Sequence, residues 1–174
     1  MDRSNETHGH SIWLIPDHAT HTAFQTVITS LAKVSGSVNF PPHITLLGQL
    51  DQPVEWLRVR LEHICNNFSR FELEMKHLGM FDRYFRSIIL HVRENHELER
   101  IYSEALRVFE YRGSERFVPH LSLMYSNLDN SEKSKFLDAV MSEWPITLTV
   151  GEVVLIETSG RSDQWQERAR YTLK

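Results

Sequence analysis

The sequence has one cysteine, Cys65, and no apolar run that approaches the roughly 20 residues needed to cross a bilayer. A disulfide within the chain is therefore excluded. Residues 1–6 are polar and do not resemble a signal peptide. We therefore expect a cytoplasmic or nuclear protein that does not bind membranes.

Positive charge is also scarce. The 174 residues include 19 Lys and Arg against 23 Asp and Glu, which gives a formal net charge of −4 at pH 7. Proteins that bind long nucleic acids neutralise many phosphates with basic side chains, and this chain has no basic excess to do so. Any nucleotide that it handles should therefore be short. Hydrophobic residues make up 41% of the chain, which suffices for one compact core without disulfides.

Periodic patterns predict alternating strands and helices. Apolar runs and two-residue alternation favour strands over residues 11–15, 43–50, 71–75, 85–92, 121–125, 146–150, 153–158 and 169–173. Spacings of three and four favour helices over residues 24–31, 54–68, 98–109 and 131–142. Asp17 or Thr20 can cap the first helix, and Gly36 follows its end.

The order of these segments indicates the fold class. Strand-helix units recur in both halves, and no linker or low-complexity tract divides the chain. This pattern favours an α+β fold of two similar lobes, each an antiparallel sheet with outer helices, facing each other across a central cleft. We expect residues 11–174 to form one bilobal domain after a polar N-terminal segment, residues 1–10.

The most informative feature is a motif that occurs twice. Residues 42–47 read Pro-His-Ile-Thr-Leu-Leu, and residues 119–124 read Pro-His-Leu-Ser-Leu-Met. A chain of this composition contains roughly 0.3 Pro-His pairs by chance, and a hydroxyl two places later lowers that figure several-fold. Alternate residues of a strand share a face. Each histidine therefore projects beside its hydroxyl, while the apolar neighbours point into a core.

Two imidazoles and two hydroxyls suit acid–base chemistry on a phosphodiester. If the two strands lie side by side, His43 and Thr45 meet His120 and Ser122 in one cleft. An imidazole has a pKa of about 6.5, so one histidine can accept a proton from water while the other protonates the departing sugar oxygen. Thr45 and Ser122 would donate hydrogen bonds to phosphoryl oxygens. No metal is needed, and His-x-Thr lacks the usual spacing of zinc ligands.

At these motifs the chain resembles the two-histidine (2H) phosphoesterase superfamily, whose signature is two His-x-Thr/Ser tetrapeptides flanked by apolar residues on paired strands. Residues 12–16, Ile-Trp-Leu-Ile-Pro, and Tyr125 after the second motif look most like its cyclic phosphodiesterase branch. The resemblance implies that Trp13 and Tyr125 line the substrate cleft. It also places a loop near the cleft over residues 159–166, which include Trp165.

The same resemblance implies an activity. Enzymes of that branch open ADP-ribose 1″,2″-cyclic phosphate, a by-product of tRNA splicing, and nucleoside 2′,3′-cyclic phosphates to 2′-phosphates. By resemblance, His120 would activate water and His43 would protonate the leaving oxygen. We expect a monomer without a cofactor that binds a small nucleotide cyclic phosphate, with short RNA ends as alternative ligands.

Other interpretations remain open. The same chemistry would serve cleavage or ligation of 2′,5′ linkages, hydrolysis of cyclic dinucleotides or trimming of RNA 3′ ends. A non-catalytic module could hold a nucleotide phosphate in the same cleft. Arg86 and His91 lie on opposite faces of a predicted strand, so at most one of them points to the cleft, and we interpret both as structural. Cys65 lies on an apolar helix face and is interpreted as a small buried hydrophobe.

Overall fold

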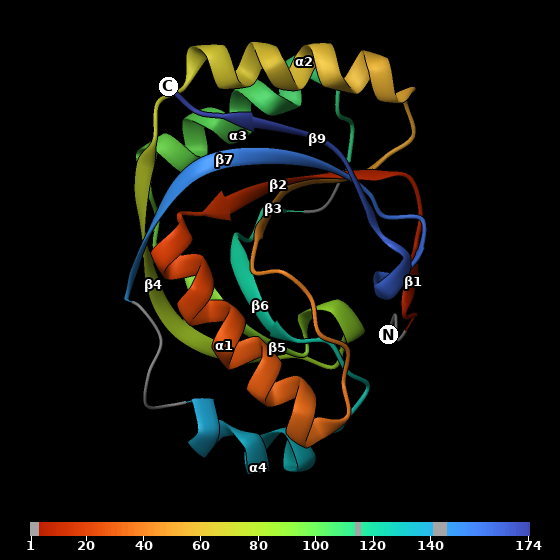
Figure 1. Ribbon diagram of the computed structural model, residues 1–174, viewed down its shortest axis with the longest axis vertical. Helices are drawn as coiled ribbons and strands as arrows, with labels where there is room; N and C mark the ends of the chain where they lie inside the picture. The colour runs from red at the N-terminus through yellow and green to blue at the C-terminus, as the bar shows by residue number, and fades with distance from the viewer. Residues whose placement is uncertain (1–3, 114–115, 141–145) are drawn as a thin grey trace.

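A computed structural model describes residues 4–113, 116–140 and 146–174, without the side chains of residues 137–140. Its main elements form two successive β-α-β-α-β units (Figure 1). The first unit consists of β2 (His10–Pro16), α1 (His18–Ser35), β3 (Ile44–Leu50), α2 (Val54–Asn67) and β4 (Phe71–Met80). The second consists of β5 (Ile88–Val92), α3 (His96–Val108), β6 (His120–Met124), α4 (Asn130–Val140) and β7 (Thr147–Glu157). The remaining strands are β1 (Glu6–Thr7), β8 (Gly160–Arg161) and β9 (Gln166–Thr172).

The strands of both units join in one antiparallel sheet. Its order is β2-β3-β6-β5-β4-β7-β9, and β2 also pairs with β7, so the six strands from β2 to β7 close into a ring. The last strand of each unit pairs with the first strand of the other, because β4 pairs with β5 and β7 pairs with β2. Two equivalent halves result, β3-β2-β7 and β6-β5-β4. The predicted α+β fold with two similar halves is confirmed.

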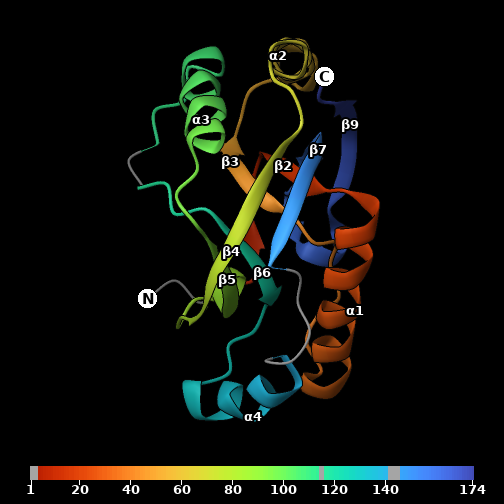
Figure 2. The ribbon, with the colours of Figure 1, turned by 90° about the vertical axis from the view of Figure 1, so that its left-hand side faces the viewer.

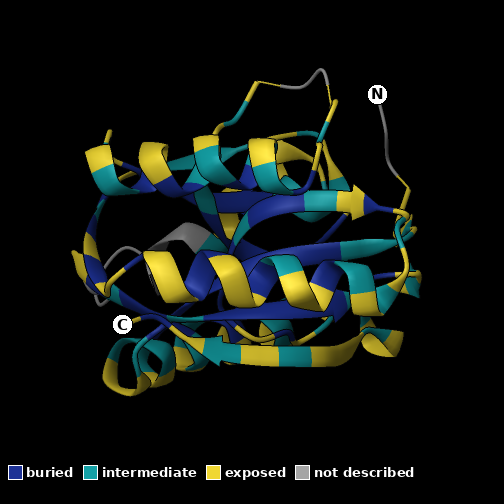
Figure 3. Cartoon of the chain, turned by 90° about the horizontal axis from the view of Figure 1, so that it is seen from above, coloured by how far each residue is buried: buried dark blue, intermediate teal, exposed yellow. Residues whose placement is uncertain are grey.

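The helices cover the outside of the sheet. Figures 1 and 2 show α2 and α3 together at one end of the molecule, and α1 with α4 towards the other. Helix α1 packs against β2 and β6, α2 against β7 and β9, and α3 against β3. Seen from above, the outward helix faces are exposed while most of the strands beneath them are buried (Figure 3). No helix in the described part of the chain is long and apolar enough to cross a membrane.

Local sequence explains the bounds of α1. Of the two predicted caps, Asp17 is the one used, since its carboxylate accepts a hydrogen bond of 3.0 Å from the backbone N–H of Thr20. The helix ends at Gly36, whose φ of 69° lies in the left-handed region that glycine adopts without strain. Its buried face carries Phe24 and Ile28, as the spacing predicts.

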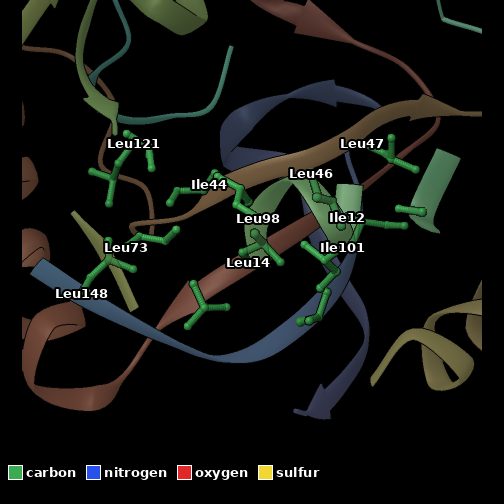
Figure 4. Close-up of a cluster of buried hydrophobic side chains, with 14 of the residues drawn as sticks. Ile12, Leu14, Ile44, Leu46, Leu47, Leu73, Leu98, Ile101, Leu121 and Leu148 are labelled. Carbon is green, nitrogen blue, oxygen red and sulfur yellow. The ribbon is translucent and has the colours of Figure 1, made fainter. Parts of the chain in front are cut away.

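The apolar residues of both motifs lie in the core. Ile44 and Leu121 have no exposed surface and belong to the same buried cluster as Ile12 and Leu14 (Figure 4). Fully burying such a side chain contributes roughly 1.5 to 3 kcal/mol. A one-residue slip of either strand would move these residues to the opposite face and place the histidine in the core. The core therefore fixes which side chains reach the cleft.

Four predicted strands differ from the structure. The strand predicted over residues 85–92 begins only at Ile88, because the backbone N–H of Phe81 donates to the Ser87 carbonyl and Tyr84–Arg86 form a 3₁₀ turn inside that hairpin. The strands predicted over residues 146–150 and 153–158 are one strand, β7, which pairs with β4 near its start and with β2 and β9 beyond it. Strand β4 is longer than predicted, with an irregularity in its pairing between Met75 and Leu78. Of the fourth predicted helix, residues 141–142 lie outside the described chain.

Candidate active site

A cleft of about 600 Å³ lies beside the contact between β3 and β6. These two strands pair only at Ile44 and Leu121. Strand β3 continues beyond this point alongside β2 alone, which leaves its other edge open to the cleft. The cleft is lined by every residue that the sequence predicted for the site: Trp13, His43, Thr45, His120, Ser122 and Tyr125.

The strand pairing brings the two motifs face to face. Because Ile44 lies opposite Leu121 in an antiparallel pair, His43 lies across from Ser122 and Thr45 across from His120. Each histidine is thus next to the hydroxyl residue of the other motif, as well as two residues from its own. The sequence predicted that both pairs share a face, and the structure gives the crossed arrangement.

The two histidines are held in the same way. The Nδ1 atom of His43 lies 2.7 Å from the Pro41 carbonyl oxygen, and that of His120 lies 2.7 Å from the Val118 carbonyl oxygen. A carbonyl only accepts hydrogen bonds, so each Nδ1 carries the hydrogen. The neutral ring then keeps its free electron pair on Nε2. Each histidine therefore offers Nε2 as a proton acceptor, or as a donor once protonated.

His43 is enclosed by aromatic rings. Trp13 stacks on its imidazole with ring centroids 3.5 Å apart and planes 9° apart, and only 5% of His43 is exposed. The Tyr125 hydroxyl lies 3.5 Å from the Nε2 atom of His43, and the Tyr125 ring stacks on Phe40. Trp165 packs edge-on against Trp13 at 5.7 Å. One face of Trp13 therefore supports the histidine and is not open to a nucleotide base.

Burial shifts the pKa of both histidines in the empty cleft. Desolvation is the largest cause and lowers the pKa of His43 to about 3 and that of His120 to about 4. Repulsion by His120 further lowers the pKa of His43, and repulsion by Arg86 and His91 further lowers that of His120. The expectation of two pKa values near 6.5 is therefore wrong for the free protein. Both imidazoles are neutral at pH 7 until an anion enters.

The two hydroxyl residues are not equivalent. The Ser122 hydroxyl is buried and donates a hydrogen bond of 2.9 Å to the Phe85 carbonyl. Thr45 is half-buried, and its hydroxyl makes no hydrogen bond to another described residue. Thr45 can therefore donate to a ligand at once, whereas Ser122 has to give up its bond to Phe85 before it can donate.

The cleft is positively charged although the chain is acidic overall. Arg86, Arg112 and Arg116 line it, and its described lining contains no Asp or Glu. Arg86, which we had interpreted as structural, lies in the cleft, whereas His91 is not part of the lining. Neither Arg112 nor Arg116 was predicted from the sequence to line the cleft. Their position in the polar segment just before the second motif was the one available signal.

Cys65 is not poised to act as a nucleophile. Burial raises the pKa of its thiol to about 12, which fits the interpretation of this residue as a small buried hydrophobe. Within residues 4–113, 116–140 and 146–174, no group of three or more His, Cys, Asp or Glu side chains gathers closely enough to hold a metal ion.

Comparison with known proteins identifies the family. The model of the 2′-5′ RNA ligase superfamily matches residues 19–162. The chain belongs to this superfamily. A cyclic phosphodiesterase of Arabidopsis thaliana is 20% identical over 124 residues, which are 71% of this chain and 68% of that protein. The predicted membership of the two-histidine phosphoesterases is confirmed.

Solved structures show the same fold at low sequence identity. E. coli LigT complexed with 3′-AMP is 15% identical, with a TM-score of 0.63 over 95% of this chain and 97% of that one. The protein TT0787 of Thermus thermophilus is 13% identical, with a TM-score of 0.63 over 94% of this chain and 97% of that one. The region matched by the 2′-5′ RNA ligase superfamily contains both motifs but neither Trp13 nor Trp165. The position of these two rings is therefore known from the structure alone.

Proposed function

We propose that the protein hydrolyses small cyclic phosphodiesters, such as ADP-ribose 1″,2″-cyclic phosphate or nucleoside 2′,3′-cyclic phosphates, without a metal. The observation that carries this proposal is the pair of cleft histidines, each fixed through Nδ1 so that Nε2 is free to transfer a proton. Membership of a phosphoesterase superfamily and likeness to a cyclic phosphodiesterase support it. LigT structures contain phosphate, 3′-AMP, ATP or NADP⁺, which supports a nucleotide-sized ligand.

In the proposed reaction, neutral His120 removes a proton from water as the water oxygen bonds to phosphorus. The bond between phosphorus and one ring oxygen breaks, and protonated His43 donates its proton to that oxygen. The products are a phosphomonoester and a sugar hydroxyl. Thr45 and, after rotation, Ser122 donate hydrogen bonds to the other phosphoryl oxygens, which carry the charge that develops.

The surroundings of the two histidines support this assignment of acid and base. Desolvation and the positive charge of Arg86 disfavour a charged His120, which suits a base. The stacked Trp13 face stabilises a positive charge on His43, which suits an acid. In the empty cleft, burial opposes that charge strongly, so the negative substrate phosphate has to raise the pKa of His43 when it binds.

The size of the cleft favours a nucleotide over long RNA. Small-molecule sites enclose about 300 to 1,000 Å³, and this cleft encloses about 600 Å³. The net charge of −4 adds no basic surface along which a long chain could bind. Cleavage of 2′,5′ linkages in short oligonucleotides, or binding without catalysis, remain the alternatives that the experiment must separate.

Turnover in the presence of EDTA is the first test. We expect the protein to convert ADP-ribose 1″,2″-cyclic phosphate and nucleoside 2′,3′-cyclic phosphates to phosphomonoesters at an undiminished rate after exhaustive chelation, because histidines supply both proton transfers. Product analysis by chromatography would show it, with short 2′,5′-linked oligonucleotides as the competing substrates. Loss of activity with EDTA and recovery with a divalent metal would contradict the metal-free mechanism. Cleavage of the oligonucleotides alone would support the alternative.

The hydroxyl residues give a second prediction. We expect the double variant Thr45→Ala/Ser122→Ala to lose roughly 10²- to 10⁴-fold in kcat/KM, since it lacks two hydrogen bonds to charged oxygens and each contributes about 1.5 to 3 kcal/mol. Of the single variants, only Ser122→Ala should also lower the thermal midpoint, because it removes the bond to the Phe85 carbonyl. Thr26→Ala, an exposed threonine of α1, is the matched control. Unchanged kinetics in the double variant would leave both residues as ordinary strand positions.

A further inference from the structure

The cleft extends from the histidines to the segment that joins α3 to β6. Arg112 and Arg116 of this segment belong to the lining and are exposed. The described residues on either side are held in place: the Phe117 ring stacks on Tyr102 of α3 with centroids 3.8 Å apart, and the backbone N–H of Tyr111 donates a hydrogen bond of 3.0 Å to the Leu106 carbonyl. A Cβ atom at Gly113 would collide with the Tyr111 ring. Arg112 and Arg116 thus line the cleft close to residues that are held against α3.

No carboxylate of the described residues neutralises their charge. Most arginines of the chain lie in ion pairs with described carboxylates, and all of these lie outside the cleft lining: Arg58, Arg60, Arg93, Arg100, Arg107, Arg161, Arg168 and Arg170. Arg112 and Arg116 form no ion pair with a carboxylate in the described residues. Among the described residues, these two guanidinium groups thus have no carboxylate partner at the edge of the cleft, where they can bind an anion.

The reacting phosphate does not need these arginines. In the proposed reaction it lies between the two motifs, where Thr45, Ser122 and the protonated histidine would supply its hydrogen bonds and Arg86 would add a positive charge. Guanidinium groups match phosphate oxygens in a planar, bidentate way. We propose that Arg112 and Arg116 form a second anion subsite, which binds a phosphate of the substrate other than the one that reacts.

This inference rests on the proposed function and narrows its substrate class. The preferred substrate would be a nucleotide that carries a further phosphate beside its cyclic one. That phosphate belongs either to a diphosphate linkage, as in ADP-ribose derivatives, or to the preceding linkage of a short oligonucleotide. A nucleoside 2′,3′-cyclic phosphate without a second phosphate would fill only part of the cleft.

Calorimetric binding of two product-like ligands tests the subsite without any turnover. Adenosine 2′-monophosphate and adenosine 2′,5′-bisphosphate differ by one phosphate group. At low ionic strength we expect the wild-type protein to bind the bisphosphate about 10-fold more tightly, and added salt to reduce this ratio. In Arg112→Ala/Arg116→Ala the ratio should fall to about 1, while the affinity for the monophosphate changes by less than about 2-fold.

A matched control removes the same charge elsewhere. Arg58→Ala/Arg100→Ala takes two exposed arginines from ion pairs on α2 and α3 and should keep the wild-type ratio. Three results would overturn the subsite. The wild-type protein could bind the bisphosphate and the monophosphate with equal affinity. The Arg112/Arg116 variant could keep the wild-type affinity ratio, or the control could lose it to the same extent.

Turnover distinguishes the two sources of the second phosphate and separates this inference from the proposed function. The substrates are adenosine 2′,3′-cyclic phosphate, ADP-ribose 1″,2″-cyclic phosphate and a dinucleotide that ends in a 2′,3′-cyclic phosphate. We compare the kcat/KM of the two larger substrates with that of adenosine 2′,3′-cyclic phosphate, which has no second phosphate. The larger substrate that loses its higher kcat/KM in Arg112→Ala/Arg116→Ala contains the phosphate that the subsite binds. If no substrate is turned over but the binding preference holds, the proposed function fails and the subsite stands. If all three react equally in wild type and variant, the subsite fails and the proposed function stands.

Discussion

Alanine at either cleft histidine is expected to lower kcat by roughly 10²- to 10⁴-fold, the usual contribution of one general acid or base. His43→Ala removes the proposed proton donor and His120→Ala the proposed acceptor. Steady-state rates on a nucleoside 2′,3′-cyclic phosphate provide the measurement. His96→Ala is the matched control, since His96 is an exposed histidine at the start of α3, outside the cleft lining.

Because His43 is buried under Trp13, its removal also leaves a cavity. His43→Gln fills more of the space without titrating near neutral pH, so a similar loss in both variants would separate chemistry from packing. Thermal midpoints show which variants are folded. Near-wild-type activity in a folded variant of either histidine would remove that histidine from the mechanism.

The leaving group separates the two roles. A phosphodiester with a good leaving group needs no proton donor, so His43→Ala should recover much of its lost rate on such a substrate. His120→Ala should remain impaired, because the attacking water still needs a base. The opposite pattern would exchange the roles of acid and base, and rescue of neither variant would argue against acid–base catalysis.

The sequence could predict which side chains line the cleft because these residues belong to local patterns. A period of two residues shows which side chains share a strand face, and the repetition of the motif indicates that two such strands work together. Thr45 and Ser122 could be placed beside their histidines on this basis alone. The crossed arrangement, with His43 across from Ser122, depends on the register of Ile44 with Leu121, which the motif does not contain.

Long-range contacts account for most of what the sequence did not predict. Gly151 and Glu152 looked like a break between two strands, yet they lie inside β7, which is held by β4 near its start and by β2 and β9 further along. The exchange of β4 and β7 between the two halves also depends on which strands pair, and the hydrophobic periodicity of the sequence does not show this. Arg112 lies in the cleft lining, and residue spacing does not predict which side chains of the segment after α3 lie there.

The pKa shifts are the clearest case of this limit. Desolvation depends on how closely the rings around His43 pack, and the two motifs contain no measure of that. The two histidines have nearly equivalent sequence environments, but Trp13 stacks on one while Arg86 and His91 repel charge on the other. The structure therefore shows a difference between the surroundings of the two histidines that the symmetry of the motifs does not contain.

The second large effect concerns pH. The reaction needs neutral His120 and protonated His43, and kcat/KM reports on these states in the free protein. With pKa values of about 3 and about 4 in the empty cleft, the protonated acid becomes scarce as pH rises above these values. We therefore expect kcat/KM to fall by about tenfold per pH unit between pH 5 and 8, instead of peaking near neutrality.

The profile of kcat should differ, because it reports on the substrate complex. The negative phosphate favours the protonated imidazole, which raises the pKa of His43 and moves the alkaline limb of kcat to higher pH. The distance in pH between the alkaline limb of kcat and that of kcat/KM measures how far the bound phosphate shifts the pKa of His43. Titration of the histidine ring signals by NMR, with and without inorganic phosphate, checks the same shift without turnover, and His43→Gln and His120→Ala assign the signals.

Stability limits the acid end of the experiment. Unfolded histidines take up protons near pH 6.5, whereas His43 and His120 in the folded protein resist protonation down to pKa values of about 3 and about 4. The unfolded state therefore binds more protons in this range, and the free energy of unfolding falls as pH drops from about 6.5 towards 4. Rates are to be compared only where circular dichroism shows the native fold. A kcat/KM profile centred near pH 6.5, with ring signals that titrate there in the free protein, would show that the cleft does not depress these pKa values. A flat profile from about pH 5 to 9 would exclude the two histidines as acid and base.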